Sequence, residues 1–151
     1  MQLSNCRRIH NSKNNNDAIN LKFLADYNNS GGGDVFVNAQ IDTYGGDFYF
    51  DTNGGVVLIN ENITTYGGDI TLITSAGEIQ VEQLNSSGFN GGNDEVGNDA
   101  GKITLDALGN ITLNQNILAN GGDGNANSSG KAYSGGKGAD INIKSTAGNI
   151  F

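Results

Sequence analysis

The chain contains no proline and no tryptophan, and its only cysteine is Cys6. The absence of proline excludes collagen-like and polyproline segments as well as proline-rich linkers. A single cysteine cannot form an internal disulfide, so the sequence predicts no disulfide framework. The longest aliphatic run is residues 56–59, far shorter than the roughly 20 residues that cross a bilayer. We therefore expect no membrane insertion. The residues near Met1 contain no apolar stretch that would predict a signal peptide.

Basic residues are few, and some of them lie near the amino terminus. Eight Lys and Arg residues stand against 16 Asp and Glu residues, which gives a net charge of −8. Both arginines, Arg7 and Arg8, belong to this amino-terminal stretch. From Ile19 onward, 15 acidic residues face only 5 lysines. Because such a negatively charged body repels phosphate backbones and anionic headgroups, we expect neither nucleic acid nor an anionic lipid surface as a partner.

Glycine and asparagine are abundant, with 24 residues each among 151. Both residue types favour turns and disfavour helix interiors. Leu, Ile, Val and Phe together number 36, which exceeds the roughly 20% below which a charged chain is expected to stay disordered. The composition therefore predicts a turn-rich protein with a thin apolar core.

The sequence repeats itself. The pentapeptide Thr-Tyr-Gly-Gly-Asp occurs at residues 43–47 and again at 65–69. An aliphatic residue, Asn, any residue, Asn or Gln, and Ile precede a Gly-Gly pair three times. Alternating apolar residues follow a charged corner residue four times, at residues 47–50, 69–72, 102–105 and 140–143. A period of about 22 residues, as between the two pentapeptides, is typical of solenoids and other repeat proteins.

Each repeat predicts two or three short strands, because apolar and polar residues alternate within it. The side chains expected on the inner face are Phe48, Phe50, Ile70, Leu72, Ile103, Leu105, Ile111, Leu113, Ile141 and Ile143. Hairpins enforce no constant repeat length, whereas a coil that stacks on its predecessor must return to the same place every turn. The predicted fold is therefore all-β, a parallel β-helix (β-solenoid) with about 22 residues per coil.

Two kinds of residue are expected to stack between coils. The Gly-Gly pairs of the repeated pentapeptide would stack at one corner, where a positive φ is easy for glycine and a side chain would clash with the neighbouring coil. Asn38, Asn60 and Asn114 predict an amide ladder. Glu82 takes the place of asparagine in one coil and interrupts that ladder.

Two insertions, residues 85–100 and 120–139, lengthen the repeat at the glycine-rich corner. They consist almost entirely of Gly, Asn, Ser, Asp and Lys, which predicts corner loops without periodicity that project from one edge of the solenoid. Residues 1–16 show no apolar pattern, so we expect a disordered tail there. Residues 17–151 are expected to form the β-helix segment, with an incomplete last coil.

Residues 17–47 combine a strand, an Asn-Asn-Ser-Gly-Gly-Gly corner and an Ile-Asp-Thr-Tyr-Gly-Gly-Asp ending, and Gly-Asp-Ile-Thr-Leu and Gly-Asn-Ile units follow. In these features the chain resembles the filamentous-haemagglutinin-like exoproteins, large bacterial surface or secreted adhesins that are exported by two-partner secretion. The resemblance covers most of residues 17–151. Because the secretion domain of that family carries Asn-Pro motifs and this chain has no proline, the chain looks like an internal or carboxy-terminal stretch of such a protein.

The resemblance implies a right-handed coil and a structural and adhesive role. It also implies a secreted or cell-surface location, an outer-membrane secretion transporter as partner, and adhesion to a host or neighbouring cell surface, matrix or glycan. Export is an implication of the resemblance alone, since no residue of the chain signals it.

Pectate-lyase-like enzymes are also parallel β-helices, and they resemble one another in clustered calcium-binding carboxylates with a basic residue as proton acceptor. In this chain both arginines and the only histidine, His10, lie in the tail. No serine has a histidine partner with which to form a nucleophilic triad. We therefore expect no enzymatic activity. The alternative is a carbohydrate-active β-helix domain, polysaccharide-binding or lyase-like, whose catalytic half lies outside this chain.

Four carboxylates are candidates for the paired acid and base of glycoside hydrolysis, namely Asp47, Asp69, Glu78 and Asp140. Three of them, Asp47, Asp69 and Asp140, recur at one position of the repeat. Recurrence at one position is typical of a residue that shapes the corner of a repeat, so we expect a structural role for these three.

The insertions carry the remaining candidate sites. Asp94, Glu95 and Asp99 offer oxygen ligands of the kind that calcium prefers, but we expect solvated loop acids, no metal and no cofactor. Because both insertions leave equivalent corners of a parallel solenoid, they should lie side by side and share an edge for partner binding. The residues expected along this edge are Phe89, Asp94, Glu95, Lys131 and Tyr133.

The incomplete last coil predicts end-to-end self-association. Ile141, Ile143, Ile150 and Phe151 would face an unfinished layer. A row of unpaired strand amides beside them is a template for pairing with another chain.

Overall fold

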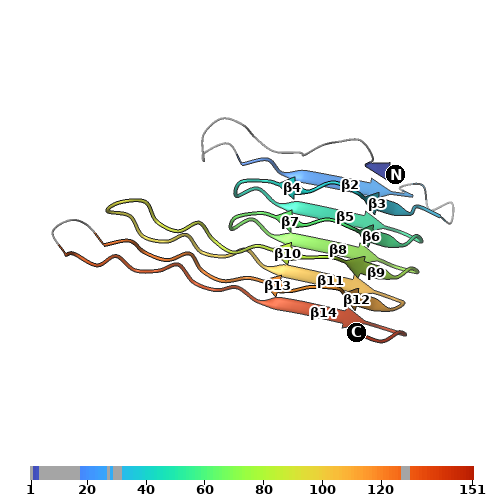
Figure 1. The fold of residues 1–151 in the computed structure, drawn as a ribbon. Coiled ribbons are helices and arrows are strands. Elements are labelled where there is room, and N and C mark those ends of the chain that lie inside the picture. Colours follow the sequence, from blue (N-terminus) through green and yellow to red (C-terminus); the bar gives the residue numbers. More distant parts are fainter. Residues whose placement is uncertain (1, 4–17, 27, 29–31, 127–129) are drawn as a thin grey trace.

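The computed structural model describes residues 2–3, 18–26, 28, 32–126 and 130–151. The part of the chain that it describes is all-β and contains strands but no helix. It therefore has no helix long and apolar enough to cross a membrane. The strands form three parallel sheets, in which segments far apart in the sequence lie one above the other (Figure 1).

Sheet C, the sheet with the longest strands, has the order β14-β11-β8-β5-β2. Its strands are β2 (Leu21–Ala25), β5 (Phe48–Thr52), β8 (Ile70–Thr74), β11 (Ile103–Ala107) and β14 (Ile141–Ser145). Neighbouring strands are parallel and in register, so that Leu72 lies opposite Phe50 on one side and Leu105 on the other. Identical positions of successive repeats thus stack directly on each other.

Two further sheets consist of shorter strands. Sheet A, in the order β1-β3-β6-β9-β12, comprises β1 (Gln2–Leu3), β3 (Val35–Val37), β6 (Val57–Ile59), β9 (Ile79–Val81) and β12 (Ile111–Leu113). Sheet B, in the order β13-β10-β7-β4, comprises β4 (Ile41–Asp42), β7 (Ile63–Thr64), β10 (Leu84–Asn85) and β13 (Ile117–Leu118).

From β2 onward, the chain visits sheets C, A and B in turn. We call each set of three consecutive strands a unit: β2–β4, β5–β7, β8–β10 and β11–β13, with β14 opening the fifth. Val35 lies opposite Val57 and Ile41 opposite Ile63, at the same separation along the chain as the two copies of the pentapeptide. The prediction of short parallel strands that stack repeat on repeat is confirmed, and the arrangement is consistent with a β-solenoid.

The alternation of apolar and polar residues places one set of side chains between the sheets. The residues that are at most 1% exposed include Val35, Val37, Ile41, Phe48, Phe50, Val57, Ile59, Ile63, Ile70, Leu72, Ile79, Val81, Leu84, Ile103, Leu105 and Ile111. Most of the predicted inward residues belong to this core. Leu113 and Ile143 are only partly buried and Ile141 is 40% exposed, because they lie at the end of the stack, where no further unit covers them.

The glycine-rich corner between sheets B and C has two requirements. The buried Thr43 and Thr65 hydroxyls donate to the Gly46 and Gly68 carbonyls and thereby close the turn. A Cβ atom on Gly68 would lie 2.1 Å from the Gly46 carbonyl oxygen, so the second glycine of each pair allows two backbones to approach. Gly67, the first glycine of its pair, has a φ of 104°, which a residue with a side chain rarely adopts. The predicted stacking of the Gly-Gly pairs is confirmed.

The predicted asparagine ladder takes a different form. The Asn60 side-chain amide donates to Asn38 Oδ1 over 2.7 Å. Farther along, the Asn114 side-chain amide donates to a carboxylate oxygen of Glu82 over 3.2 Å. The row thus consists of two pairs, and Glu82 is an acceptor in it, because a carboxylate accepts the amide N–H as well as an amide oxygen does.

At the amino terminus, Gln2–Leu3 form β1, which pairs in parallel with β3. The disordered tail expected over residues 1–16 stays a prediction, since almost all of it falls on residues that the structure does not describe. Residues 4–17, with Cys6 and His10 among them, lie outside the described residues.

Candidate functional site

Two long projections leave the corner between sheets B and C (Figure 1). We call residues 87–100 the first arm and residues 120–138 the second arm. The Ser86 hydroxyl donates to the Gly101 carbonyl over 2.6 Å. This bond corresponds to the one between Thr65 and Gly68, which closes the corner in a repeat without an insertion. The first arm is therefore inserted between Ser86 and Gly101, and Asn85 belongs to β10 instead of the insertion.

At the base of the second arm, the Ala139 N–H donates to the Ala119 carbonyl over 3.0 Å. Ala119 directly follows β13 as Ser86 directly follows β10. The predicted boundaries of the insertions thus shift by one or two residues, because the corner residues that precede and follow each arm remain part of the stack.

Within each arm, the outgoing and returning segments are joined by hydrogen bonds three residues apart. In the first arm, the N–H groups of Glu95, Asn98 and Gly101 donate to the carbonyls of Gly92, Phe89 and Ser86. In the second arm, the N–H groups of Gly136 and Ala139 donate to those of Gly122 and Ala119. A period of three is that of the polyproline II helix. The insertions are corner loops as predicted, since the described residues of both arms form no helix or strand, but the prediction missed the period of three in their hydrogen bonds.

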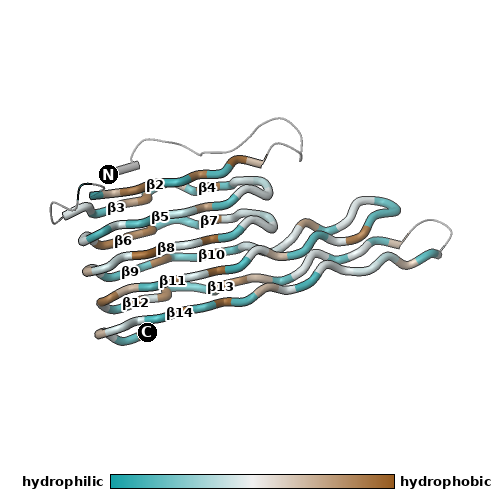
Figure 2. Tube along the Cα trace, turned by 180° about the vertical axis from the view of Figure 1, so that it is seen from behind, coloured by the Kyte–Doolittle hydropathy of each residue, from teal (hydrophilic) through white to brown (hydrophobic). Residues whose placement is uncertain are grey.

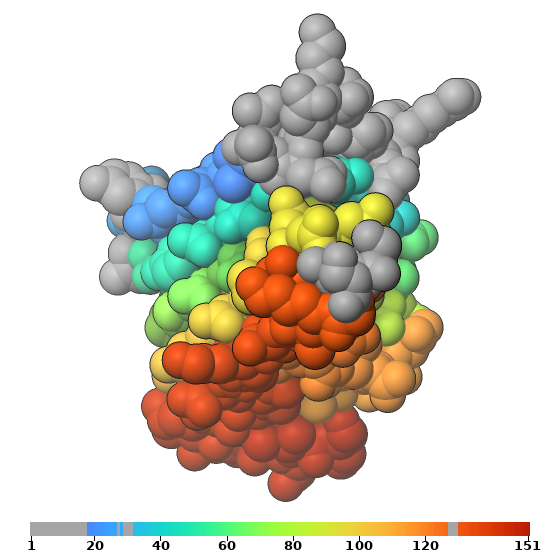
Figure 3. Space-filling model, turned by 90° about the vertical axis from the view of Figure 1, so that its left-hand side faces the viewer, coloured from blue at the N-terminus to red at the C-terminus, as the bar shows by residue number. Residues whose placement is uncertain are grey.

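The two arms are also bonded to each other. The bonds, again three residues apart, run from Gly88 N–H to Asn120 O, Gly91 N–H to Asp123 O, Gly97 N–H to Ser134 O, Ala100 N–H to Lys137 O and Gly122 N–H to Asn98 O. Viewed onto their tips, the arms lie against each other (Figure 3). The prediction that the insertions lie side by side is confirmed.

Glycine makes this close packing of backbones possible. A Cβ atom on Gly122 would lie 1.9 Å from the Phe89 carbonyl oxygen, and one on Gly136 would lie 1.9 Å from the Asn98 carbonyl oxygen. Collagen uses glycine at every third position for the same reason, since only glycine fits where such chains touch. The arms carry little apolar colour compared with the strands (Figure 2). Backbone hydrogen bonds and glycine contacts, instead of an apolar core, therefore order them.

The five predicted edge residues have contacts of different kinds. On the second arm, the Lys131 ammonium lies 5.0 Å from the centre of the Tyr133 ring. On the first arm, a carboxylate oxygen of Glu95 accepts the Gly92 N–H over 3.1 Å, and Asp94 turns the chain at the tip with a φ of 66°.

Phe89 belongs to an aromatic cluster at the base of the first arm. Its ring stacks on that of Tyr66, with the ring centres 4.3 Å apart, and the Tyr44 ring stacks on Tyr66 at 5.3 Å. The repeated pentapeptide predicts that the two tyrosines stack on each other. It does not predict that Phe89 joins them, because each tyrosine directly follows its threonine, whereas Phe89 lies three residues after Ser86. An open groove beside this cluster is lined by Gly45, Tyr66, Gly67, Val96, Gly97, Asn98 and Asp99.

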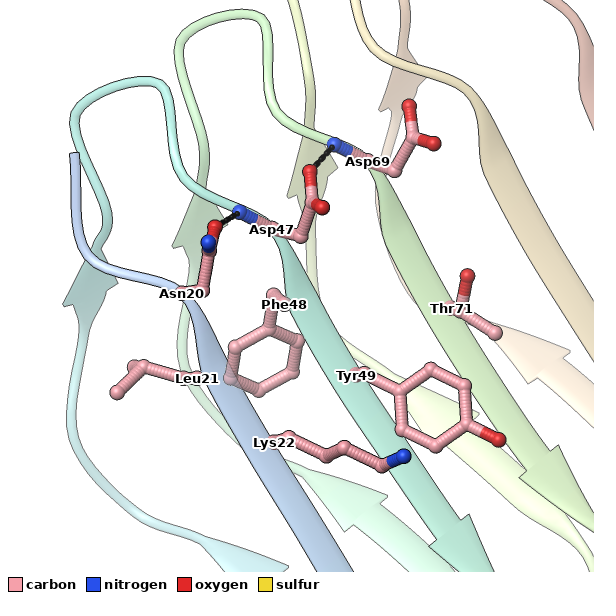
Figure 4. A pocket seen from close by; sticks show the side chains of 8 residues that line it. All are labelled: Asn20, Leu21, Lys22, Asp47, Phe48, Tyr49, Asp69 and Thr71. Carbon is pink, nitrogen blue, oxygen red and sulfur yellow. Dashed lines mark hydrogen bonds between the residues drawn. The ribbon is translucent and has the colours of Figure 1, made fainter.

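A second candidate site lies on the outer face of sheet C, near the starts of β2, β5 and β8. This groove has a volume of about 390 Å³ and is lined by Asn20, Leu21, Lys22, Asp47, Phe48, Tyr49, Asp69 and Thr71 (Figure 4). Its corner residues form a ladder: the Asp47 N–H donates to Asn20 Oδ1 over 2.8 Å, and the Asp69 N–H donates to Asp47 Oδ1 over 2.9 Å. The Lys102 N–H donates to Asp69 Oδ1 over 2.7 Å.

Tyr49 is at the centre of this face. The Lys22 ammonium lies 4.9 Å from the centre of its ring, a cation–π contact. The Tyr49 hydroxyl donates to Asp51 Oδ2 over 3.2 Å. Burial, then the negative charge of Asp51 and then this hydrogen bond raise the pKa of Tyr49 above its usual value. The phenol therefore stays a neutral hydrogen-bond donor throughout the physiological pH range.

The four candidate acid–base carboxylates have different surroundings. Asp47 and Asp69 each use one oxygen to accept the backbone N–H of the next unit, which is the corner role expected from their place in the repeat. Asp140 holds the same position two units beyond Asp69. Glu78 precedes β9 of sheet A, at the opposite corner, and accepts a side-chain N–H of Asn110 over 3.1 Å.

Two acidic residues of the first arm, Glu95 and Asp99, accept hydrogen bonds from backbone N–H groups of the arms. Asp99 Oδ1 accepts the Lys137 N–H over 2.7 Å and so links the two arms. Among the described residues, no group of three or more His, Cys, Asp or Glu side chains is placed to hold a metal ion.

Comparison of the chain with models of protein families, with curated proteins and with solved structures gives no match. The likeness to filamentous-haemagglutinin-like exoproteins thus stays a prediction from the sequence. Function has to be argued from the two arms and the grooves.

Proposed function

We propose that the chain is a structural and adhesive segment of a secreted or surface-exposed bacterial exoprotein of the filamentous-haemagglutinin-like kind. In this proposal the three parallel sheets are the walls of a right-handed parallel β-helix with about 22 residues per plain coil. In-register pairings at the separation of the repeated pentapeptide occur in all three sheets and support this coil. Export through an outer-membrane transporter follows from the resemblance.

One observation carries the adhesive role: two arms project from the same corner of the stack and are bonded to each other along their length. Binding residues are most often found on projecting segments held by a rigid scaffold. Because these arms are ordered by their own hydrogen bonds, contact with a surface requires little further ordering, and the entropy lost on binding is correspondingly small. Their exposed side chains are the proposed contacts with a cell surface, matrix or glycan.

Shortening both arms tests this role. Replacing residues 87–100 with Tyr-Gly restores a plain corner between Ser86 and Gly101, and residues 120–138 can be replaced in the same way. We expect adhesion of chain-coated beads to cells or extracellular matrix to fall about tenfold, while the melting temperature measured by circular dichroism stays that of a folded stack. The Gln80→Ala variant, changed at an exposed site of β9, is the control. Undiminished adhesion of a folded armless variant would show that the arms are spacers.

The last unit predicts a second kind of contact, between copies of the chain. β14 is an edge strand of sheet C, and Ile141, Ile150 and Phe151 at this end are 40%, 49% and 68% exposed. Because an uncovered strand edge beside apolar side chains pairs readily with another chain, we expect the mass measured by light scattering to exceed 15.7 kDa and to rise with concentration. The double variant Ile141→Lys, Phe151→Lys should restore the monomer. If the unmodified chain is monomeric at high concentration, the prediction is contradicted.

A further inference from the structure

The outer face of sheet C carries a site that is separate from the arms. The groove of about 390 Å³ lies on one side of the Lys22–Tyr49 pair. A second hollow of about 300 Å³ lies on the other side and is lined by Lys22, Leu24, Ala25, Tyr49, Asp51 and Asn53. Both volumes are in the range of small-ligand sites, which begins at roughly 300 Å³. The two hollows share Lys22 and Tyr49, so one ligand can lie across both.

Hydrogen-bond acceptors are concentrated at the start of the strands. Asp47 and Asp69 each spend one oxygen on a backbone N–H, which leaves the other oxygen of each carboxylate as an acceptor at the groove wall (Figure 4). Since they hold equivalent positions on adjacent parallel strands, which lie about 4.8 Å apart, the two carboxylates form a pair of acceptors at a fixed spacing. Such a pair suits a ligand with several hydroxyl donors.

The middle of the same face adds apolar surface. The Lys22 ammonium lies over the Tyr49 ring (Figure 4), and Leu24, which is 45% exposed, lines the same hollow as Tyr49. An aromatic ring that carries a neutral hydroxyl combines an apolar surface with a polar edge. A pyranose ring has the matching design, with C–H groups on its faces and hydroxyls around its rim.

Charge narrows the class of sugar. Asp47, Asp51 and Asp69 line the two hollows, in which Lys22 is the one cationic lining residue, and the whole chain has a net charge of −8. This potential repels uronic acids, sialic acids and sulfated sugars. A sugar without charge meets no such barrier.

We propose that this face binds a neutral hexose oligosaccharide, with the C–H face of one sugar on Tyr49 and its hydroxyls donating to Asp47 and Asp69. The inference deepens the proposed function and rests on it, because it names the glycan class that an adhesive segment would recognise. It assigns recognition to the wall of the stack, whereas the arms provide contacts of their own.

The test is titration of the full chain with cellohexaose, maltohexaose and hexagalacturonate, measured by isothermal calorimetry. We expect at least one neutral hexasaccharide to bind and hexagalacturonate to show no binding. Tyr49→Ala should weaken that binding about tenfold, since it removes an aromatic contact of roughly this size. The double variant Asp47→Asn, Asp69→Asn should weaken it to a similar extent, because each asparagine keeps one acceptor oxygen and loses the second.

The asparagine variants are expected to fold. Asn20 already holds this corner position, and its amide oxygen accepts the Asp47 N–H over 2.8 Å. Two matched controls should bind like the unmodified chain: Asp140→Asn, at the same corner position in the last unit, and Phe36→Ala, at the outward position of β3 in sheet A.

Three results would overturn the inference: no binding of either neutral hexasaccharide at millimolar concentration, binding that survives both sets of groove variants, or tighter binding of hexagalacturonate. None of these depends on the arms. If armless variants lose adhesion while sugar binding fails, the proposed function stands and the glycan site falls. If sugar binding holds while armless variants adhere fully, the role of the arms falls instead.

Discussion

Replacing Leu72 with aspartate is expected to unfold the chain. Leu72 is fully buried and lies between Phe50 and Leu105 in the inner column of sheet C. Loss of the leucine contacts alone costs about 2–5 kcal/mol, and an unpaired carboxylate in an apolar core adds several kcal/mol more. Because the total stability of a domain is about 5–15 kcal/mol, these losses together are enough to abolish folding.

Circular dichroism checks this prediction through the far-ultraviolet β signal and the thermal transition. Gln80→Asp is the matched control, since Gln80 points outward from β9 and is exposed, so the added charge stays in water. The control should melt like the unmodified chain. An unchanged β signal and melting temperature for Leu72→Asp would mean that the inner column does not support the stack.

The stack itself was predictable because two periods coincide in the sequence. Alternation of apolar residues identifies which side chains point inward, as at Phe48 and Phe50, and the spacing of the repeat identifies which strands lie opposite each other. In a repeat protein each unit contacts its neighbours alone, so one correct unit predicts the next. At Leu113 and Ile141 the rule breaks down, because residues at the end of the stack lack a neighbour on one side.

The order within the arms was not predictable from apolar patterns. Their contacts join backbone to backbone, so no hydrophobic residue marks them. The available signal is glycine at a spacing of three, as in Gly88 and Gly91 or Gly121 and Gly124, but a composition so rich in glycine hides it. Hydrogen bonds between the arms reveal the period only once two such segments lie together.

The groove on sheet C escaped prediction for a different reason. Lys22 lies opposite Tyr49, which lies opposite Thr71. The first of these steps is longer along the chain than the second, because the corner after β2 is longer than the corner after β5. Without the register of β2, neither the cation–π pair nor the hollows on its two sides could be inferred from the sequence.

Replacing Gly122 with alanine is expected to disrupt the arms and leave the stack intact. The added methyl carbon would lie 1.9 Å from the Phe89 carbonyl oxygen, an atom of the backbone that cannot turn aside. Overpacking of this kind costs about 1–3 kcal/mol. Because the arms are held by hydrogen bonds to each other, this loss of free energy should destabilise the closed state of the arms and make their local opening more frequent. Amide hydrogen exchange should then accelerate roughly tenfold to a hundredfold in both arms.

The measurement compares the amides of Gly91, Gly97 and Asn98, which donate within and between the arms, with amides of β8 in the same sample. The β8 amides should keep their protection from exchange, since the atoms that a methyl group on Gly122 would meet belong to the first arm and not to β8. Gly92→Ala is the matched control: it adds the same methyl group at the tip, where the nearest atom, 3.0 Å away, is the end of the flexible Glu95 side chain. Because that side chain can move, the control should exchange like the unmodified chain. Equal exchange in the two variants would mean that glycine contacts do not order the arms, and the argument for pre-ordered adhesive projections would lose its basis.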